Sequence, residues 1–351
     1  MKKIRHPGKY PLYDAENNIN DECWDQIDSQ SFKVRAGKNY KSNGLKQKSK
    51  DAFYKTVAVD IFNSEKGLKN FGALIDFDYL DRKFEEENSK FAPKDIKGKP
   101  LSHSNITNAA DDAIKRSISS NQEIGDSSSR DFKISKSFFS EANINLATEP
   151  NSNLKLTAKP TAKMKLPTWF VISITVPLEA KSFLGSKKDE KSNVCVLYGQ
   201  IQHKIIEKAE REKNPSLILL KHFVFNQETL TSPDLPIRKR FKVIAKTLNA
   251  ETINFPKIVR SLLKKFNGKP FLARTSSSFF LGESYFEVNV DMNKFGYLSQ
   301  TGLSGIRPYL QSFDFGFGFV VQSETDEEMP EQIIMCVKFI KIKLSEKMCK
   351  L

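Results

Sequence analysis

The sequence predicts an α+β fold, in which a largely antiparallel, curved β-sheet is packed by two or three helices. Segments with alternating apolar side chains outnumber segments with helical spacing, and they do not alternate as β-α-β-α units. Many of these segments follow one another closely, as hairpin strands do. The chain also has 27 Phe against 2 Trp and 9 Tyr, which suits a large apolar interior because Phe has no polar group.

The expected strands lie on both sides of a long polar stretch. They alternate apolar and polar residues or are rich in β-branched and aromatic residues, and they cover residues 32–35, 53–62, 167–178, 194–201, 238–246, 271–275, 284–291, 315–321 and 333–344. Helical spacing predicts helices over 201–212 and 255–266, and a third around 295–313 that Pro308 kinks or restarts. The apolar residues 217–225 fit neither pattern well enough to assign.

The polar stretch over residues 81–165 is dominated by Ser, Asn, Lys, Asp and Glu. Such a composition cannot bury enough apolar surface to offset its ordering entropy, so a disordered insertion is predicted, with one short helix over 109–119. A small second domain is the alternative. We expect residues 22–80 and 166–345 to form a single domain around it, after a flexible N-terminus over 1–21.

The formal net charge is +14, which favours phosphate-bearing partners such as anionic lipid or nucleic acid, or else only a solvated surface. Four dispersed Cys and four dispersed His predict no zinc site, no catalytic triad and no cofactor. The basic start is followed by no apolar run, and no apolar run is long enough to span a bilayer. We therefore expect a cytoplasmic protein whose membrane contact, if it has any, is peripheral.

Six motifs occur in a fixed order along the chain. The first is Trp24 followed by Phe32-Lys33-Val34-Arg35 and Tyr40. The others are Val59-Asp60-Ile61-Phe62, the strand from Pro167 to Val176-Pro177, Arg240-Phe241-Lys242-Val243-Ile244, Tyr285-Phe286-Glu287-Val288-Asn289-Val290-Asp291 and Glu327-Glu328-Met329-Pro330-Glu331. In this order they resemble the C-terminal domain family of the plant enhanced disease resistance 2 protein, over about residues 22–75 and 166–345.

The resemblance implies a regulatory role linked to lipids, because in the plant proteins this domain follows a phosphoinositide-binding pleckstrin-homology domain and a lipid-binding START domain. Neither companion occurs in this chain. The resemblance carries no catalytic residues, so we expect no enzyme. A curved sheet crossed by helices would be START-like.

Two groups of basic residues are predicted to bind phosphate headgroups, because Arg makes bidentate phosphate contacts. One is the strand face with Arg238, Arg240 and Lys242, and the other is the turn with Arg35, Lys38 and Tyr40. The alternatives are a solvated face, ion pairs from the strand to Glu287 and Asp291, and a structural pair between Arg35 and Asp60.

An apolar ligand cavity is predicted between two strands, and the alternative is an ordinary core. Its expected lining is Phe286, Val288, Phe315, Phe317 and Phe319, with Gly316 and Gly318 leaving room for a ligand or another backbone. The function that follows is a non-enzymatic module that binds lipid or another apolar ligand and meets anionic membranes. A nucleic-acid- or protein-binding scaffold is the alternative, although the signatures of RNA-binding modules are missing.

Overall fold

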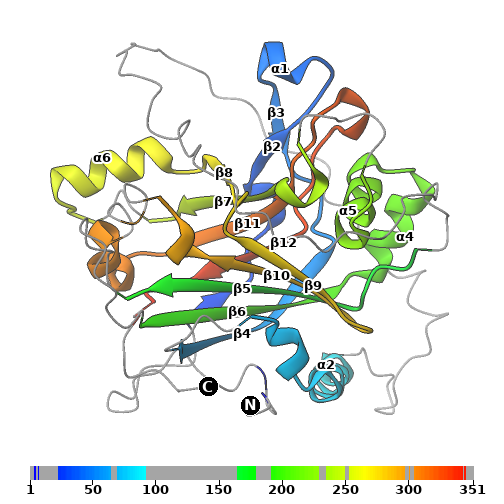
Figure 1. Cartoon of the computed structure of the whole chain (residues 1–351), viewed down its shortest axis with the longest axis horizontal. Helices are drawn as coiled ribbons and strands as arrows, with labels where there is room; N and C mark the ends of the chain where they lie inside the picture. Colours follow the sequence, from blue (N-terminus) through cyan, green and yellow to red (C-terminus); the bar gives the residue numbers. More distant parts are fainter. Residues whose placement is uncertain are drawn as a thin grey trace, which may run out of the picture. The chain divides into compact units, whose positions relative to one another are not determined.

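The computed structural model describes residues 4, 7, 23–64, 69–91, 164–178, 191–228, 235–249, 253–296, 300, 304–342 and 344. The chain divides into two compact units, Met1–Tyr79 with Leu156–Leu351, and Leu80–Lys155. Every strand among the described residues lies in the first unit (Figure 1). Of the second unit the structure describes only residues 80–91, so the predicted helix over 109–119 lies outside the described residues.

The first sheet has five strands whose neighbours are all antiparallel. Their order is β1 (Trp24–Asp25), β12 (Met335–Phe339), β11 (Phe315–Val321), β7 (Phe241–Thr247) and β8 (Pro270–Leu272). The N-terminal β1 thus pairs with the C-terminal β12, which ties the two ends of the described chain together.

The second sheet also has five strands, and only its pair β5–β10 is parallel. The order is β4 (Tyr54–Ser64), β6 (Ser192–Ile201), β5 (Trp169–Pro177), β10 (Tyr285–Asp291) and β9 (Ser277–Leu281). A separate hairpin joins β2 (Lys33–Arg35) to β3 (Lys46–Lys48).

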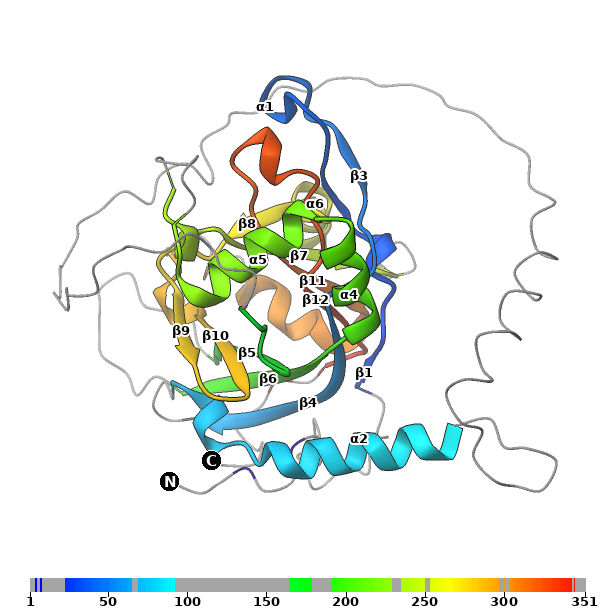
Figure 2. The same ribbon diagram turned by 90° about the vertical axis from the view of Figure 1, so that its right-hand side faces the viewer.

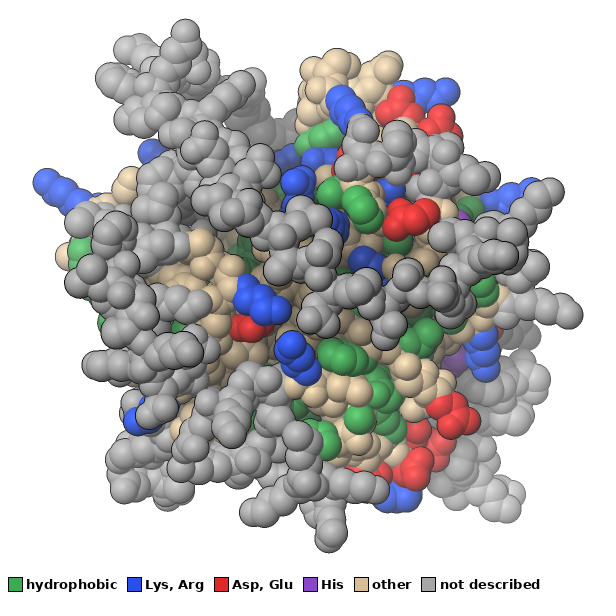
Figure 3. Space-filling model, viewed as in Figure 1, with side chains coloured by type: hydrophobic (Ala, Val, Ile, Leu, Met, Phe, Trp, Pro, Cys, Tyr) green, Lys and Arg blue, Asp and Glu red, His purple; other side chains and the backbone are tan. Residues whose placement is uncertain are grey.

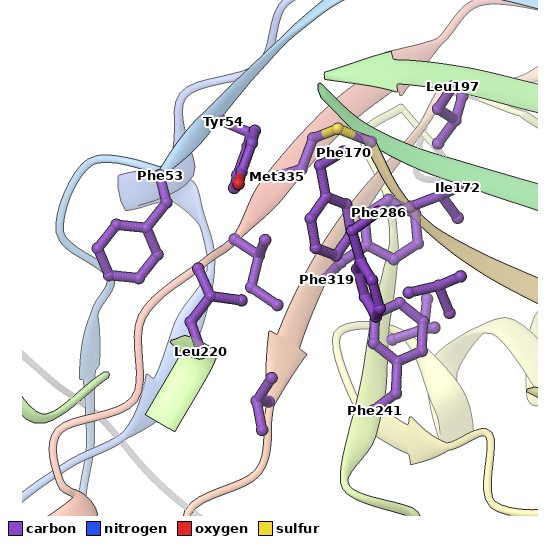
Figure 4. Packing of buried hydrophobic residues seen from close by; sticks show 14 of the residues in the cluster. Phe53, Tyr54, Phe170, Ile172, Leu197, Leu220, Phe241, Phe286, Phe319 and Met335 are labelled. Carbon is purple, nitrogen blue, oxygen red and sulfur yellow. The ribbon is translucent and has the colours of Figure 1, made fainter. Parts of the chain in front are cut away.

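The two sheets face each other across one large apolar core that takes side chains from both (Figure 4). Phe170 and Phe286 enter it from the second sheet, and Phe241 and Phe319 from the first. The sheets meet at one corner, where the N–H of Tyr54 donates to the carbonyl of Ile334 at 2.8 Å. A bulge between Thr56 and Ala58 lies just after this corner, as expected where a strand bends from one sheet toward another.

Two helices cover one end of this sandwich, α4 (His203–Arg211) and α5 (Pro215–Phe225), as Figure 2 shows. Pro215 occupies the first turn of α5, and the side chain of Asn214 caps it by accepting from the N–H of Ser216 at 2.9 Å. Leu220 and Phe223 of this helix are buried in the core between the two sheets. The third long helix of this unit, α6 (Lys257–Phe266), belongs to a smaller cluster built on Phe255 and Phe313.

The predicted α+β class with largely antiparallel strands is confirmed, although the strands are divided between two sheets. The START-like form stays a prediction. Helices α4 and α6 agree with the expected ranges, whereas the last strand is shorter than predicted. The residues around Pro308 form the 3-10 helix η7 (Arg307–Ser312), and α1 (Tyr40–Asn43) is a single turn.

The predicted flexible N-terminus lies outside the described residues except for Ile4 and Pro7, and Ile4 forms a bridge with Ile75. The polar insertion was expected to begin at residue 81. The structure instead continues α2 (Phe77–Phe91) through this point. Apolar residues at 77, 80, 84 and 91 follow helical spacing and account for this extension.

Candidate anion-binding site at the helix-covered end of the sandwich

Two of the cations predicted to bind headgroups are buried in ion pairs. The side chains of Arg240 and Lys242 are 0% and 2% exposed. Arg240 Nη1 donates to Glu328 Oε1 at 3.0 Å, and Lys242 Nζ donates to Glu331 Oε2 at 2.6 Å. Arg35 joins them, with its Nε 3.9 Å from Glu331. We call these five residues the buried ion cluster.

The motif from Glu327 to Glu331 supplies both carboxylates because the chain turns sharply there. The turn contains the short 3-10 helix η8 (Asp326–Glu328) and the cis bond between Met329 and Pro330. Ser323 Oγ donates to the carbonyl of Glu328 at 2.8 Å, and the N–H of Ser323 donates to Glu331 Oε1 at 3.1 Å. Three of the six family motifs therefore meet in one buried structural site.

The prediction of an exposed basic face on this strand is wrong for Arg240 and Lys242. That face of the sheet is covered by the apolar residues Phe32 and Val34, so its cations must find partners inside the protein. Their partners are also not the expected Glu287 and Asp291. Both cations are therefore inaccessible to a headgroup in this structure.

The expected pair between Arg35 and Asp60 does not form either. Arg35 contacts Glu331 instead, while Asp60 is fully buried and accepts from Tyr198 Oη at 2.8 Å. The guanidinium of Arg35 lies 4.8 Å from the ring centre of Tyr40, and Lys38 is exposed nearby. Of the predicted turn site, only Lys38 is fully accessible.

Between about pH 8 and pH 9.5, the stability of the protein is expected to rise relative to that of a Lys242→Met variant. Burial lowers the pKa of Lys242 to about 8, below its ordinary value near 10.5, although Glu331 acts in the opposite direction. In this range the unfolded chain binds a proton at Lys242 that the folded chain does not, so raising the pH favours folding through this group by up to about 2 kcal/mol.

Urea unfolding across this range, in the wild type and in Lys242→Met, measures the effect. The free energy of unfolding of the wild type minus that of the variant should increase with pH. Equal pH slopes in the two proteins would contradict the assignment. The comparison with the variant is needed because burial raises the pKa of Cys195 and Cys336, so their ionisation in the unfolded chain lowers the stability of both proteins in this range. Measurements should stop below pH 10, because burial also raises the pKa of Tyr198.

Glu287 is a second buried carboxylate with a structural role. It accepts from Ser173 Oγ at 2.6 Å and from the N–H of Gly72 at 2.7 Å. The ring of Tyr285 lies against Gly72, where any side chain would collide with it. Burial raises the pKa of Glu287. The tyrosine and glutamate of this family motif therefore hold the 3-10 helix η2 (Phe71–Leu74) on the outer face of the second sheet.

The residues predicted to line a cavity pack against one another or against the core. Phe286, Val288 and Phe319 are fully buried, whereas Phe315 and Phe317 are half-buried at its edge. The ring centres of Phe170 and Phe286 are 5.4 Å apart, and those of Phe241 and Phe319 are 5.9 Å apart; Figure 4 shows the four rings in one group. These positions are core, which was the alternative interpretation.

The space beside the strand glycines is filled by the protein itself. A side-chain carbon added at Gly316 would lie 2.7 Å from Ile27, and one added at Gly318 would lie 2.9 Å from Ile333 and 3.0 Å from Phe32. These glycines therefore make room for apolar side chains that cover the first sheet, and the expectation that they admit a ligand is not supported by the packing.

Arg238 is the predicted headgroup residue whose surroundings suit a ligand. Its guanidinium carbon lies 4.9 Å from the ring centres of both Phe279 and Phe286, and 5.5 Å from that of Phe223. Nε donates to Asn226 Oδ1 at 3.1 Å, and Nη2 donates to the carbonyl of Val224 at 2.9 Å. The C-terminal end of α5 and the strands β9 and β10 thus hold one cation against three aromatic rings.

The third nitrogen of this guanidinium, Nη1, is buried and has no hydrogen-bond partner among the described residues. No carboxylate of the described residues lies within ion-pair distance of Arg238. Burial lowers its pKa to about 10, so the guanidinium keeps its charge at neutral pH. A partly desolvated cation without a carboxylate is costly, and an anion that displaced the groups covering Nη1 would recover that cost.

An exposed apolar edge lies beside Arg238. The edge strand β9 carries Phe279 and Phe280, which are half-buried, and Leu281, which is 50% exposed. Figure 3 shows hydrophobic side chains gathered over β9 and β10, with Lys and Arg side chains close by. The arrangement can therefore receive a ligand with an anionic group and an apolar part.

Sequence reasoning found Arg238 and Phe286 separately but missed Phe223, Phe279 and Asn226. Phe223 lay in the unassigned segment and Phe279 in a strand that was not predicted. The dipeptide Asn214-Pro215 could have revealed the helix, because both residues favour helix starts. No pattern in the sequence places Phe279 near Arg238.

Among the described residues, no group of three or more His, Cys, Asp and Glu side chains could hold a metal ion. No helix in this part of the chain is both long and apolar enough to cross a bilayer. The site at Arg238 is thus defined by one cation, three rings and an apolar edge.

The chain thus forms a domain of two facing five-stranded sheets, and the sequence motifs described above supply its buried polar clusters. The family described as "Protein ENHANCED DISEASE RESISTANCE 2, C-terminal" matches residues 24–96 and 121–343. The chain belongs to this family. No curated protein and no solved structure matches it.

Proposed function

We propose that this chain is a non-enzymatic binding module for a lipid or another apolar ligand with an anionic group, and that it meets anionic membranes through Arg238. The observation that carries the proposal is the unpaired Nη1 of Arg238 over three aromatic rings. An anion there gains a charge-assisted hydrogen bond, while its apolar part has Leu281 beside it, on the same face of β9 as Phe279.

The net charge of +14 adds a long-range attraction to the same partner. A basic surface concentrates a protein at anionic lipid, and each Lys or Arg near the surface contributes about 1 kcal/mol. Charge alone does not select lipid over nucleic acid. The exposed apolar edge next to the cation favours a lipid surface, because a bilayer offers both a phosphate layer and hydrocarbon.

Vesicle flotation tests the proposal with two variants that keep the charge. Arg238→Lys should weaken binding to phosphatidylserine-containing vesicles about tenfold, because a lysine cannot donate from three fixed nitrogens or stack on the rings. Lys239→Arg is the matched control, since Lys239 is the exposed neighbour, and it should bind like the wild type. Thermal unfolding of the same samples checks that both variants fold.

Equal binding by the two variants would show that general charge, and not this site, holds the protein on the membrane. Negligible flotation of the wild type with both neutral and anionic vesicles would remove the proposal altogether. A steep salt dependence of binding to single- or double-stranded nucleic acid, in the absence of flotation, would favour the scaffold alternative.

A further inference from the structure

A hollow of about 310 Å³ lies at an end of the sandwich where both sheets finish. Leu178 follows β5 of the second sheet, Ile342 and Leu344 follow β12 of the first, and η7 completes the wall. In Figure 1 the arrow of β5 points away from α4 and α5 toward this end. The hollow is therefore separate from the site at Arg238, which lies at the helix-covered end.

The floor of the hollow is apolar and continuous with the core between the sheets. Leu178 and Ile342 are 3% and 5% exposed, and Ile342 is a member of the main core cluster. Leu344 packs against that cluster, and Pro308 adds a further apolar wall. Hydrocarbon placed here would touch side chains that already exclude water on their inner side.

The rest of the wall is polar and contains one cation. Arg307 is half-buried, and Ser304 and Gln311 lie beside it in the lining. Among the described residues no carboxylate lies within ion-pair distance of Arg307. One guanidinium with two hydrogen-bonding neighbours is suited to a single carboxylate, which it can hold through two parallel hydrogen bonds.

We propose that this hollow binds a single-chain aliphatic carboxylate of the fatty-acid class, with its carboxylate at Arg307 and its chain over Leu178 and Ile342. The volume is at the low end of the range of about 300–1,000 Å³ for small-molecule pockets, which suits one chain and not a two-chain lipid. The inference does not depend on the function proposed for Arg238.

Calorimetric titration of the full chain with dodecanoate, below its micelle concentration, tests the proposal. Arg307→Gln should weaken binding about 10- to 100-fold, because a hydrogen-bonded charge pair is lost. Gln311→Trp should also weaken it, because the exposed Gln311 can be replaced without disturbing the core while the indole fills the hollow. Dodecanol, which lacks the charge, should bind more weakly than dodecanoate.

Arg274→Gln is the matched control, because Arg274 is exposed and its replacement removes the same charge. This variant should bind dodecanoate as the wild type does. Binding that survives both Arg307→Gln and Gln311→Trp overturns the proposal, and so does the absence of dodecanoate binding by the wild type. If Arg238→Lys weakens dodecanoate binding and Arg307→Gln does not, the carboxylate belongs to the site at Arg238 and this inference fails while the proposed function stands.

Discussion

Replacing Glu331 by alanine is expected to lower the free energy of unfolding by about 3–5 kcal/mol, the loss typical when one partner of a buried ion pair is removed. Its carboxylate accepts from Lys242 Nζ at 2.6 Å and from the N–H groups of Arg35 and Ser323, both at 3.1 Å. Lys242 and Ser323 are buried, so water does not replace the lost partner of these two donors. Urea unfolding followed by circular dichroism measures the change.

Glu327→Ala is the matched control, because Glu327 belongs to the same motif but is exposed. It should change stability by less than about 0.5 kcal/mol. The double variant Lys242→Met, Glu331→Met should be more stable than Glu331→Ala, because it does not leave the charge of the fully buried Lys242 without its partner. Similar losses for Glu327→Ala and Glu331→Ala would contradict the structural role of the buried ion cluster.

Replacing Phe286 by alanine is expected to lower the free energy of unfolding by about 3–5 kcal/mol, as for other fully buried phenylalanines. The ring centre of Phe286 lies 5.4 Å from that of Phe170, 5.7 Å from that of Phe223 and 6.4 Å from that of Phe279. These neighbouring rings come from the second sheet and from α5, so they cannot close over the space without moving whole elements. Urea unfolding again gives the value.

This substitution also distinguishes a core from a ligand cavity at the predicted position. Phe280→Ala is the matched control, because Phe280 pairs with Glu287 on the opposite face of the same two strands and is only half-buried. Phe280→Ala should lower the free energy of unfolding by clearly less than Phe286→Ala does. If Phe286→Ala left stability unchanged but weakened binding of an apolar ligand, Phe286 would line a cavity after all.

Periodicity predicted the elements whose two sides face different surroundings. The strand that became β10 and the helices α4 and α6 have apolar residues on one side only, so their spacing is informative. Helix α5 was missed because Leu217, Leu219, Leu220, Phe223 and Val224 are all buried, which removes the polar face. The short strands β1 and β3 are too brief for a pattern to be reliable, whereas β8 overlaps the strand predicted over 271–275.

The candidate site shows a second limit of prediction from sequence, which concerns the surroundings of charged side chains. The sequence contains Arg238, Arg240 and Lys242 as one run of cations, yet these three side chains have different surroundings. Two find Glu328 and Glu331 inside the protein, about 90 residues later in the chain, and one lies over three rings. Local charge patterns cannot separate these outcomes, because the partners come from distant segments.

By itself the sequence determined the family, the α+β class and the mainly antiparallel pairing, because these depend on ordered motifs and on the period of apolar residues along each segment. Tertiary structure alone decided that the strands form two facing sheets and that the cavity residues are core. It also decided which cation of the predicted basic strand has no carboxylate partner among the described residues. The reason is that burial and ion pairing depend on which segments meet in space, and a one-dimensional pattern records only what each segment offers.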